Sequence, residues 1–298
     1  MRWVFATIAV VTVGLLLGHK YVPNSVGNAG SLLETFLPWL GLAVPALIIL
    51  AVVRKSWEGA LAAGLVLAVW LGLFGKLVLP GKGGGPHNLR VLTHNVGASD
   101  PAATSRSLLA ERADLVALEE LSDDSYHRYL DATYPYSVER GTVALWSKLP
   151  LAAASEVDIG IGWTRALRAV VSAPGGGQMA VYVAHLASVR VGESGFSSQQ
   201  RDRTIDELGQ AIAAEKLPRV VVLGDFNGTA YDRGLAPLTY GLDSAQAAGG
   251  FGFGFTWPAA FPMARIDHIL VRGVHVADAR VLPRTGSDHR PISADLEL

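Results

Sequence analysis

The chain has 298 residues, of which 50% are hydrophobic and only 17% are charged, below the ~25% that is usual for soluble domains. It contains no cysteine, which excludes disulfide bonds and thiol chemistry. Residues 1–86 carry six basic and two acidic residues, and the rest carries 19 basic and 24 acidic residues, a formal net charge of −5. An acidic domain without a basic run disfavours a large surface for nucleic acid.

Three apolar stretches open the chain, Trp3–Gly18, Phe36–Val53 and Gly59–Leu79. Each is near the ~20 residues that cross a bilayer as a helix. No polar face recurs in them at helical spacing, so they are not typical of buried helices in a soluble domain. We therefore expect three transmembrane helices within residues 1–80. A cleaved signal peptide is the alternative for the first stretch, and it would still leave two membrane segments.

The basic residues near these stretches bear on orientation. Arg2, Arg54 and Lys55 prefer the cytoplasm, which places Lys20 and Lys82 on the other side. This distribution predicts a multi-pass cell-membrane protein whose C-terminal part is extracytoplasmic.

A linker rich in glycine and proline, PGKGGGP at residues 80–86, follows the third stretch. Extended, seven residues span at most ~25 Å, so the next domain is held close to the membrane. We divide the chain into a membrane domain at 1–80, a linker at 81–87 and a soluble domain at 88–298.

The soluble domain alternates short apolar runs with segments of helical periodicity. We expect strands at 88–96, 115–118, 143–146, 166–171, 179–184, 220–223, 266–271 and 292–298, and helices at 99–112, 122–130 and 198–215. Polar residues cluster where these strands end. The pattern predicts an α/β protein with its functional site on one rim of a sheet or of two facing sheets.

The most informative strand end is the sequence RVVVLGDFNGTAYD, which begins at Arg219. Its β-branched run stops at Gly224, and alternation then places Asp225 and Asn227 on one side while Phe226 returns to the core. A strand followed by an Asx turn is the alternative interpretation, since Asp, Asn and Gly all favour turns.

Other strand ends offer similar groups. The candidate site residues are Asn95 in THNV, Glu120 in LEEL, His185 in AHLAS, Asp225 and Asn227 in GDFN, Asp267 in RIDH, and Asp288 and His289 in SDHRP. A thiol-free set of carboxylates and amides suits Mg²⁺ or Mn²⁺. Histidines can donate to phosphate oxygens, and a carboxylate can orient or deprotonate water. The set predicts metal-assisted hydrolysis of a phosphate ester or anhydride.

These motifs, in this order, resemble those of the endonuclease/exonuclease/phosphatase superfamily, over residues 88–298. The resemblance implies a four-layer α/β sandwich, two facing mixed β-sheets flanked by helices, here preceded by three transmembrane helices. It also implies that Glu120 is the principal ligand of Mg²⁺ (or Mn²⁺), with Asn95 beside it and Asp288 on or next to the metal. The family usually has Gln before the ligand glutamate, whereas this chain has Glu119.

The resemblance also implies the catalytic roles. Asp225 aligns or deprotonates the attacking water, Asn227 holds the phosphate or a metal-bound water, and His185 donates to the phosphate. His289 is the second donor, oriented by Asp267. Among the other histidines, we expect His268 to be the nearest to the cleft.

The substrate is predicted from the membrane segments and the charge. In layout the chain is similar to membrane-anchored actinobacterial members associated with teicoplanin resistance, which implies hydrolysis of undecaprenyl pyrophosphate, a lipid-linked phosphate, on the outer face. The aromatic stretch at 249–263 is either an apolar lip that touches lipid or an ordinary covering loop. A phosphodiesterase of sphingomyelinase or nuclease type is the second interpretation, and a non-catalytic binding protein the third. No protein partner is evident.

Overall fold

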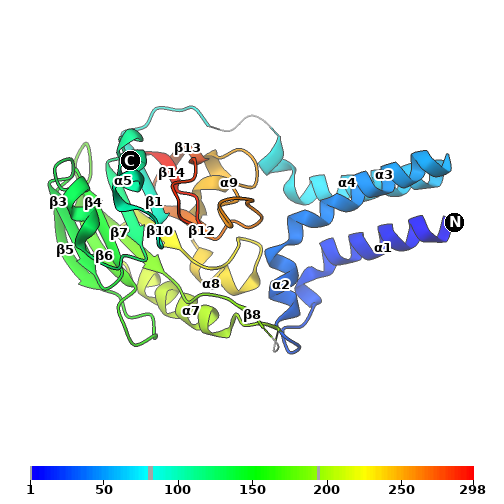
Figure 1. Cartoon of the computed structure of the whole chain (residues 1–298), viewed down its shortest axis with the longest axis horizontal. Coiled ribbons are helices and arrows are strands. Elements are labelled where there is room, and N and C mark those ends of the chain that lie inside the picture. Colours follow the sequence, from blue (N-terminus) through cyan, green and yellow to red (C-terminus); the bar gives the residue numbers. More distant parts are fainter. Residues whose placement is uncertain (1, 80–82, 193–194) are drawn as a thin grey trace.

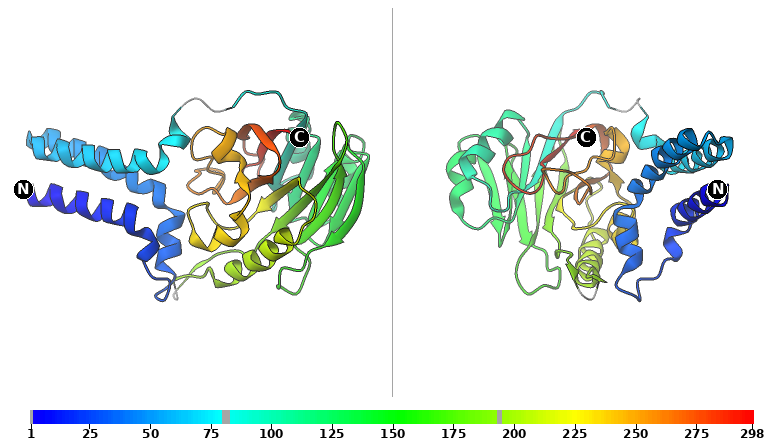
Figure 2. Two further views of the ribbon diagram at one scale, coloured as in Figure 1. Left: turned by 180° about the vertical axis from the view of Figure 1, so that it is seen from behind. Right: turned by 45° about the vertical axis from the view of Figure 1, so that its right-hand side comes forward.

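The computed structural model describes residues 2–79, 83–192 and 195–298. Three long helices extend from one side of a domain of two β-sheets (Figures 1 and 2). Of the predicted linker, residues 80–82 lie outside the described residues. Its following part lies against the C-terminal strands, because the Gly84 N–H donates to the Ala277 carbonyl at 2.9 Å.

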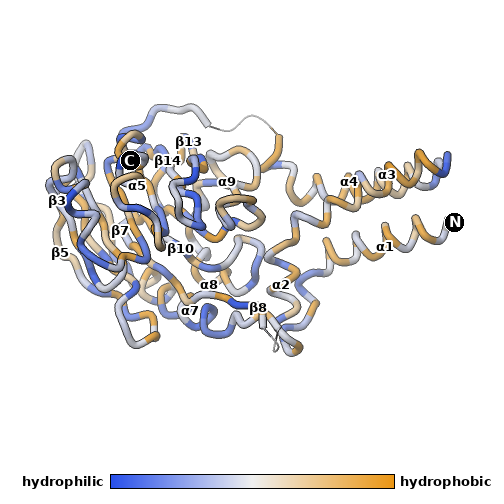
Figure 3. Tube along the Cα trace, viewed as in Figure 1, coloured by the Kyte–Doolittle hydropathy of each residue, from blue (hydrophilic) through white to orange (hydrophobic). Residues whose placement is uncertain are grey.

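The three apolar stretches form helices of membrane-spanning length. They are α1 (Arg2–Gly18), η2 (Leu37–Leu42) continued by α3 (Ala43–Arg54), and α4 (Trp57–Val78), whose N-cap is Ser56. Apolar residues run along their whole length, and the polar tip is the turn between α3 and α4 (Figure 3). Many of their large side chains are exposed, Val10, Ile49 and Leu61 among them. Such surfaces require lipid or other apolar cover, so the helices are suited to anchor the chain in a membrane.

A short segment between the first two apolar helices lies against the soluble domain. It contains η1 (His19–Tyr21) and α2 (Ala29–Thr35). The carboxylate of Glu34 accepts from the Arg233 backbone and from its Nε, each at 2.9 Å, and the Ser31 hydroxyl donates to Asp232 at 3.2 Å. These buried contacts fix the helices to the soluble domain.

The soluble domain contains two mixed sheets of six strands each. The first has the order β13-β14-β1-β2-β4-β3 and the second β11-β12-β10-β7-β6-β5. The strands of the first are β1 (Leu89–Asn95), β2 (Leu115–Glu119), β3 (Tyr136–Arg140), β4 (Val143–Ser147), β13 (His275–Val281) and β14 (Ile292–Glu297). The strands of the second are β5 (Leu151–Glu156), β6 (Ala166–Ser172), β7 (Gln178–His185), β10 (Val220–Asp225), β11 (Asp243–Ser244) and β12 (Asp267–Arg272).

Helices cover the outer faces of both sheets. On the first lie α5 (Pro101–Ala110), η3 (Asp124–Tyr126) and α6 (His127–Leu130), and on the second lie α7 (Gln199–Ala213), η4 (Arg233–Leu235) and α8 (Ala236–Thr239). The helix α9 (Ala245–Gly249) packs against β13, and the short strands β8 (Val191–Gly192) and β9 (Gly195–Phe196) form a separate pair. The predicted four-layer arrangement is confirmed.

Alternation along the strands explains these layers. In β10, Val221 and Leu223 belong to the core between the sheets, while Val220 and Val222 belong to the core beneath α7. Both faces of the strand are therefore buried, which accounts for its unbroken apolar run. Sequence periodicity did not predict β3, β5 or β13. Polar residues interrupt these strands, all three lie at sheet edges, and β3 and β5 have several exposed positions.

Candidate active site

Strand pairing brings the predicted residues to one edge of the two sheets. In the first sheet β1 and β2 are parallel, and Asn95 pairs with Glu119 at their carboxyl ends. In the second sheet β7 and β10 are parallel, and His185 pairs with Asp225. The antiparallel neighbour β12 begins with Asp267 opposite Asp225. Residues that are far apart in sequence therefore meet at a single rim.

Asp225 lies at the centre of this rim. Its Oδ1 accepts from the Asn227 backbone N–H at 2.9 Å, and its Oδ2 accepts from Asn95 Nδ2 at 3.0 Å. Nε2 of His185 lies 3.6 Å from Oδ2, and Nε2 of His289 lies 3.8 Å from it. The contact with Asn227 is the Asx turn that we considered as the alternative interpretation, so that turn is part of the site.

Asp267 and His289 form a buried pair. Nδ1 of His289 lies 3.0 Å from both carboxylate oxygens of Asp267. When that nitrogen carries the proton donated to Asp267, Nε2 is left to face Asp225 and the cleft. The predicted neighbours are thus in contact.

Burial and charge perturb the pKa values of this group. Burial raises the pKa of Asp225 to about 7, and Asp267 adds to the rise while His289 opposes it. Burial lowers the pKa of His289, but Asp267 and Asp225 more than compensate and raise it to about 10. Burial also lowers the pKa of His185 well below its usual range. The site therefore combines a cationic His289 with a neutral His185 and a carboxylate that titrates near neutral pH.

Glu120 and Asp288 lie at the mouth of the site. Glu120 follows β2 in a left-handed conformation with φ of 61°, and Asn227 has a φ of 49°. Such backbone is uncommon for residues other than glycine and is frequent at functional sites. A Cβ on Gly97 would lie 3.6 Å from Glu120 Oε2 and 3.7 Å from Asp288 Oδ1, so the two carboxylates approach the same glycine.

The neighbouring Glu119 turns away from this opening. It is fully buried, and its Oε1 accepts from the Thr93 hydroxyl at 2.6 Å. Burial raises its pKa well above the usual range, which favours the neutral acid. Glu119 therefore fills the position before Glu120 as an interior group.

A cleft of about 550 Å³ opens over these residues. Of the predicted set it is lined by Glu120, Asp225, Asn227, Asp288 and His289. The other predicted residues, Asn95, His185 and Asp267, are buried beneath them. His268 does not line the cleft as we expected, because it is fully buried, stacks on Phe226 and contacts the Gly228 carbonyl at 2.8 Å.

Comparison with protein-family models matches residues 92–289 to the endonuclease/exonuclease/phosphatase family. The chain belongs to this family. Its members hydrolyse phosphate ester bonds with the help of a metal ion, and this chain is such a hydrolase. No curated protein matched the chain.

Similar solved structures include three whose descriptions name a ligand or an activity. TDP2 from D. rerio, complexed with single-strand DNA product, shares 20% identity over 70% of this chain and 99% of that chain, with a TM-score of 0.59. The mannosyl-6-phosphatase Bt3783 of Bacteroides thetaiotaomicron shares 14% identity over 71% of this chain and 100% of that chain, with a TM-score of 0.58. A beta toxin mutant from Staphylococcus aureus with bound magnesium ions shares 15% identity over 70% of this chain and 99% of that chain, with a TM-score of 0.55. At these identities the likeness shows the fold alone.

The residues of this endonuclease/exonuclease/phosphatase site fit a hard divalent cation. Ligand atoms of Asp225, Asp267 and His289 lie within 4.8 Å of one another, a spacing that a metal ion could bridge. Near them, the His185 Nε2 lies 3.4 Å from Glu120 Oε1, and neither ring nitrogen of His185 has a hydrogen-bond partner among the described residues. Buried groups without partners and surplus carboxylates are what an anionic ligand with its cation would satisfy.

Sequence reasoning missed several groups of the cleft. Thr35 and Phe36, which precede the second apolar helix, line it together with Arg190. Arg190 also lines an adjacent pocket with Arg165. No local motif marks these residues. Arg190 and Arg165 could have been suspected only from the need to balance the charge of the carboxylates. Thr35 and Phe36 could have been found only from the packing of the membrane segment on the domain.

Proposed function

We propose that this protein is a membrane-anchored phosphohydrolase that acts on a lipid-linked phosphate, undecaprenyl pyrophosphate, at the outer face of the membrane. In this proposal residues 1–80 are the membrane domain, 81–87 the linker and 88–298 the catalytic domain. The observation that carries it is the position of Thr35 and Phe36. They connect the first two apolar helices and also line the catalytic cleft. A phosphate in that cleft lies at the end of the membrane helices, where the headgroup of a lipid is found.

The proposed chemistry uses Asp225 as the group that orients and deprotonates water. Its pKa of about 7 suits a base at neutral pH. His289, held by Asp267, donates from Nε2 to the phosphoryl oxygens, and the cationic ring stabilises the charge that develops there. His185 donates to the same phosphate, and Asn227 holds it in place.

We assign the metal to Glu120, Asn95 and Asp288 and not to the group of Asp225, Asp267 and His289, because Asp267 and His289 are already paired with each other at 3.0 Å. Bound Mg²⁺ or Mn²⁺ would supply Lewis-acid stabilisation of phosphate charge. Glu120 and Asp288 line the cleft, where Asp288 Oδ2 accepts from the Trp257 indole N–H at 3.2 Å. The amide of Asn95 is buried, donates to Asp225 and accepts from the Gly97 N–H at 3.1 Å, so its part is to hold Asp225 and the loop next to the metal.

The orientation is supported by where the charges lie along the helices. The N-terminus and the Arg54–Lys55 turn are at the end of the helices remote from the sheets (Figure 1). Lys20, in η1 directly after α1, and Lys76, in the last turn of α4, lie near the opposite end. If the N-terminus and the Arg54–Lys55 turn lie in the cytoplasm, the catalytic domain lies outside, where lipid carrier pyrophosphate is accessible. The link to antibiotic resistance stays a prediction from the resemblance.

Phosphate release by the purified full-length protein tests the proposed function. Undecaprenyl pyrophosphate, a sphingomyelin-type diester and plasmid DNA are compared with Mg²⁺ present, with Asp225→Asn as the inactive control. Release of phosphate from the lipid pyrophosphate with intact plasmid supports the proposal. Cleavage of the diester or nicking of the plasmid without phosphate release supports a phosphodiesterase instead. A reporter that is active only after export should be active when it is fused after Leu298.

A further inference from the structure

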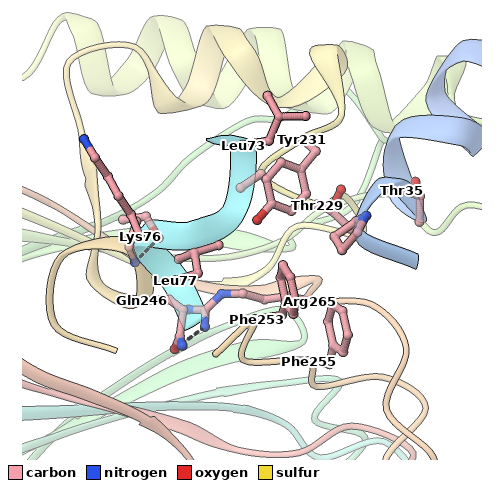
Figure 4. A pocket seen from close by; sticks show the side chains of 14 residues that line it. Thr35, Leu73, Lys76, Leu77, Thr229, Tyr231, Gln246, Phe253, Phe255 and Arg265 are labelled. Carbon is pink, nitrogen blue, oxygen red and sulfur yellow. Dashed lines mark hydrogen bonds between the residues drawn. The ribbon is translucent and has the colours of Figure 1, made fainter. Parts of the chain in front are cut away.

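Two apolar cavities lie between the membrane helices and the catalytic domain. The inner cavity, of about 220 Å³, is walled by α4 on one side and by the aromatic loop before β12 on the other (Figure 4). The outer cavity, of about 420 Å³, lies between η2, α3, α4 and the same loop. Leu73, Leu77 and Tyr231 line the inner cavity, and Leu42 and Leu67 the outer one.

The cavities and the catalytic cleft form a series that shares walls. Thr35 lines both the cleft and the inner cavity. Pro38, Phe253 and Phe255 line both the inner and the outer cavity. The outer cavity lies within the membrane-spanning helices, and Leu42 on its wall is 59% exposed. The two cavities therefore lie one after the other between the lipid-facing surface of the helices and the catalytic cleft.

Stacked aromatic rings build the shared wall. Phe255 stacks on Trp39 with ring centroids 5.6 Å apart and on Phe253 at 5.3 Å, and Phe253 meets Trp70 edge-on at 5.7 Å. The indole N–H of Trp39 donates to the Met263 carbonyl at 2.7 Å. These contacts tie the aromatic loop to the membrane helices and keep its rings on the cavities.

The charges around the inner cavity favour a ligand with an anionic end. Arg265 lines it and is buried, and its one side-chain partner among the described residues is the neutral Gln246 at 2.7 Å. Its guanidinium lies beside Gln246 and Gly254 on the wall of the inner cavity (Figure 4), while the backbone neighbours Ala264 and Ile266 line the catalytic cleft. Lys76 is the second cation on the cavity wall. Positive charge beside an apolar cavity suits a hydrocarbon chain that ends in phosphate.

We propose that the hydrocarbon chain of the substrate occupies the inner and outer cavities while its phosphates lie in the catalytic cleft. This inference rests on the proposed function and adds the site that selects a long-chain substrate. Each methylene that moves from an apolar environment into water weakens binding about fourfold. A chain that continues through the two cavities avoids that cost, and a short-chain pyrophosphate gains little from them.

The matched pair Leu73→Trp and Leu71→Trp tests the proposal. Both residues lie on α4 and are similarly exposed, at 43% and 39%, but Leu73 lines the inner cavity and Leu71 lines neither cavity. Hydrolysis of undecaprenyl pyrophosphate and of geranyl pyrophosphate is measured in the same micelles with full-length protein. We expect Leu73→Trp to lower kcat/KM for the long-chain substrate about 15-fold, the effect of about two methylenes. The kcat/KM for geranyl pyrophosphate should change less than twofold. Leu71→Trp should match the wild type on both.

Several results would overturn the proposal. If the wild type hydrolyses both pyrophosphates with equal kcat/KM, or if Leu73→Trp hydrolyses the long-chain substrate as well as the wild type does, the proposed function stands but the chain lies elsewhere. If the wild type releases no phosphate from either, the proposed function fails and this inference fails with it. Photo-crosslinking of the wild type with a benzophenone-bearing polyprenyl phosphate does not depend on the variants. Adducts at residues 73–77 and 251–255 are expected, and their absence from both segments contradicts the proposal.

Discussion

Replacement of Glu34 by alanine should destabilise the contact between the membrane segment and the catalytic domain by about 3 kcal/mol, the lower end of the usual cost of breaking a buried ion pair, because the Arg233 side chain is 32% exposed. Glu34 is fully buried and receives hydrogen bonds from the Arg233 backbone and side chain at 2.9 Å, and lies 2.7 Å from Nδ1 of His19. Burial by itself raises the pKa of Glu34, but the hydrogen bonds lower it by more than burial raises it. The net pKa is below the usual value, so the carboxylate is ionised.

The magnitude follows from the contacts that each variant removes. Glu34→Gln keeps the shape but loses the charge, and a hydrogen bond to a charged group is worth about 1.5–3 kcal/mol. Glu34→Ala loses the acceptor and leaves Arg233, among the described residues, with the carbonyls of His19 and Lys20 as its side-chain acceptors, at 2.7 and 2.8 Å. The alanine variant should therefore be the less stable of the two.

Thermal unfolding of full-length protein in detergent micelles measures the effect. One kcal/mol corresponds to roughly 2–4 °C for a domain of 150–250 residues, so Glu34→Ala should lower the apparent Tm by about 6–12 °C. Lys148→Gln is the control, because its pair with Asp114 spans 3.4 Å, is one-third exposed and is expected to contribute under about 1 kcal/mol. An apparent Tm for Glu34→Ala within about 2 °C of the wild type would refute the reasoning.

Three further predictions concern the site and the pH dependence of stability. EDTA should abolish turnover, and Mg²⁺ or Mn²⁺ should restore it; full activity in excess chelator would contradict this. Glu120→Gln should raise the metal concentration required, and Asp225→Asn should lower kcat by ~10²-fold or more. Removal of Asp267 or of His289 should lower kcat by similar factors and the double variant little further, whereas multiplying effects would show that they act independently. The hydrogen bond from Arg168 lowers the pKa of Glu215 from 4.5 to about 2. Ionised Glu215 therefore contributes up to about 3 kcal/mol to the free energy of unfolding above pH ~4.5, and this contribution is lost as pH falls toward 2. An acid-unfolding midpoint unchanged in Glu215→Gln would disprove it.

The sequence predicted the elements whose residues carry their own physical signal. The unbroken apolar run of 220–223 has both faces buried, and the three apolar stretches are long enough to span a membrane, so composition and length identify them. The site motifs could be assigned for a related reason. Most lie directly at the end or the start of a buried strand, and polar groups are stable at such a position only when they face an opening or one another.

Other features depend on contacts between distant segments, and only the tertiary structure decided them. Glu119 and Glu120 are adjacent in the sequence, yet the first is buried against Thr93 and the second faces the cleft, because a left-handed residue follows the strand. Thr35 and Phe36 carry no motif and enter the cleft only because α2 packs on the loop after β10. Local sequence patterns report burial and backbone preference, whereas a cleft formed by segments about 200 residues apart exists only once the chain has folded.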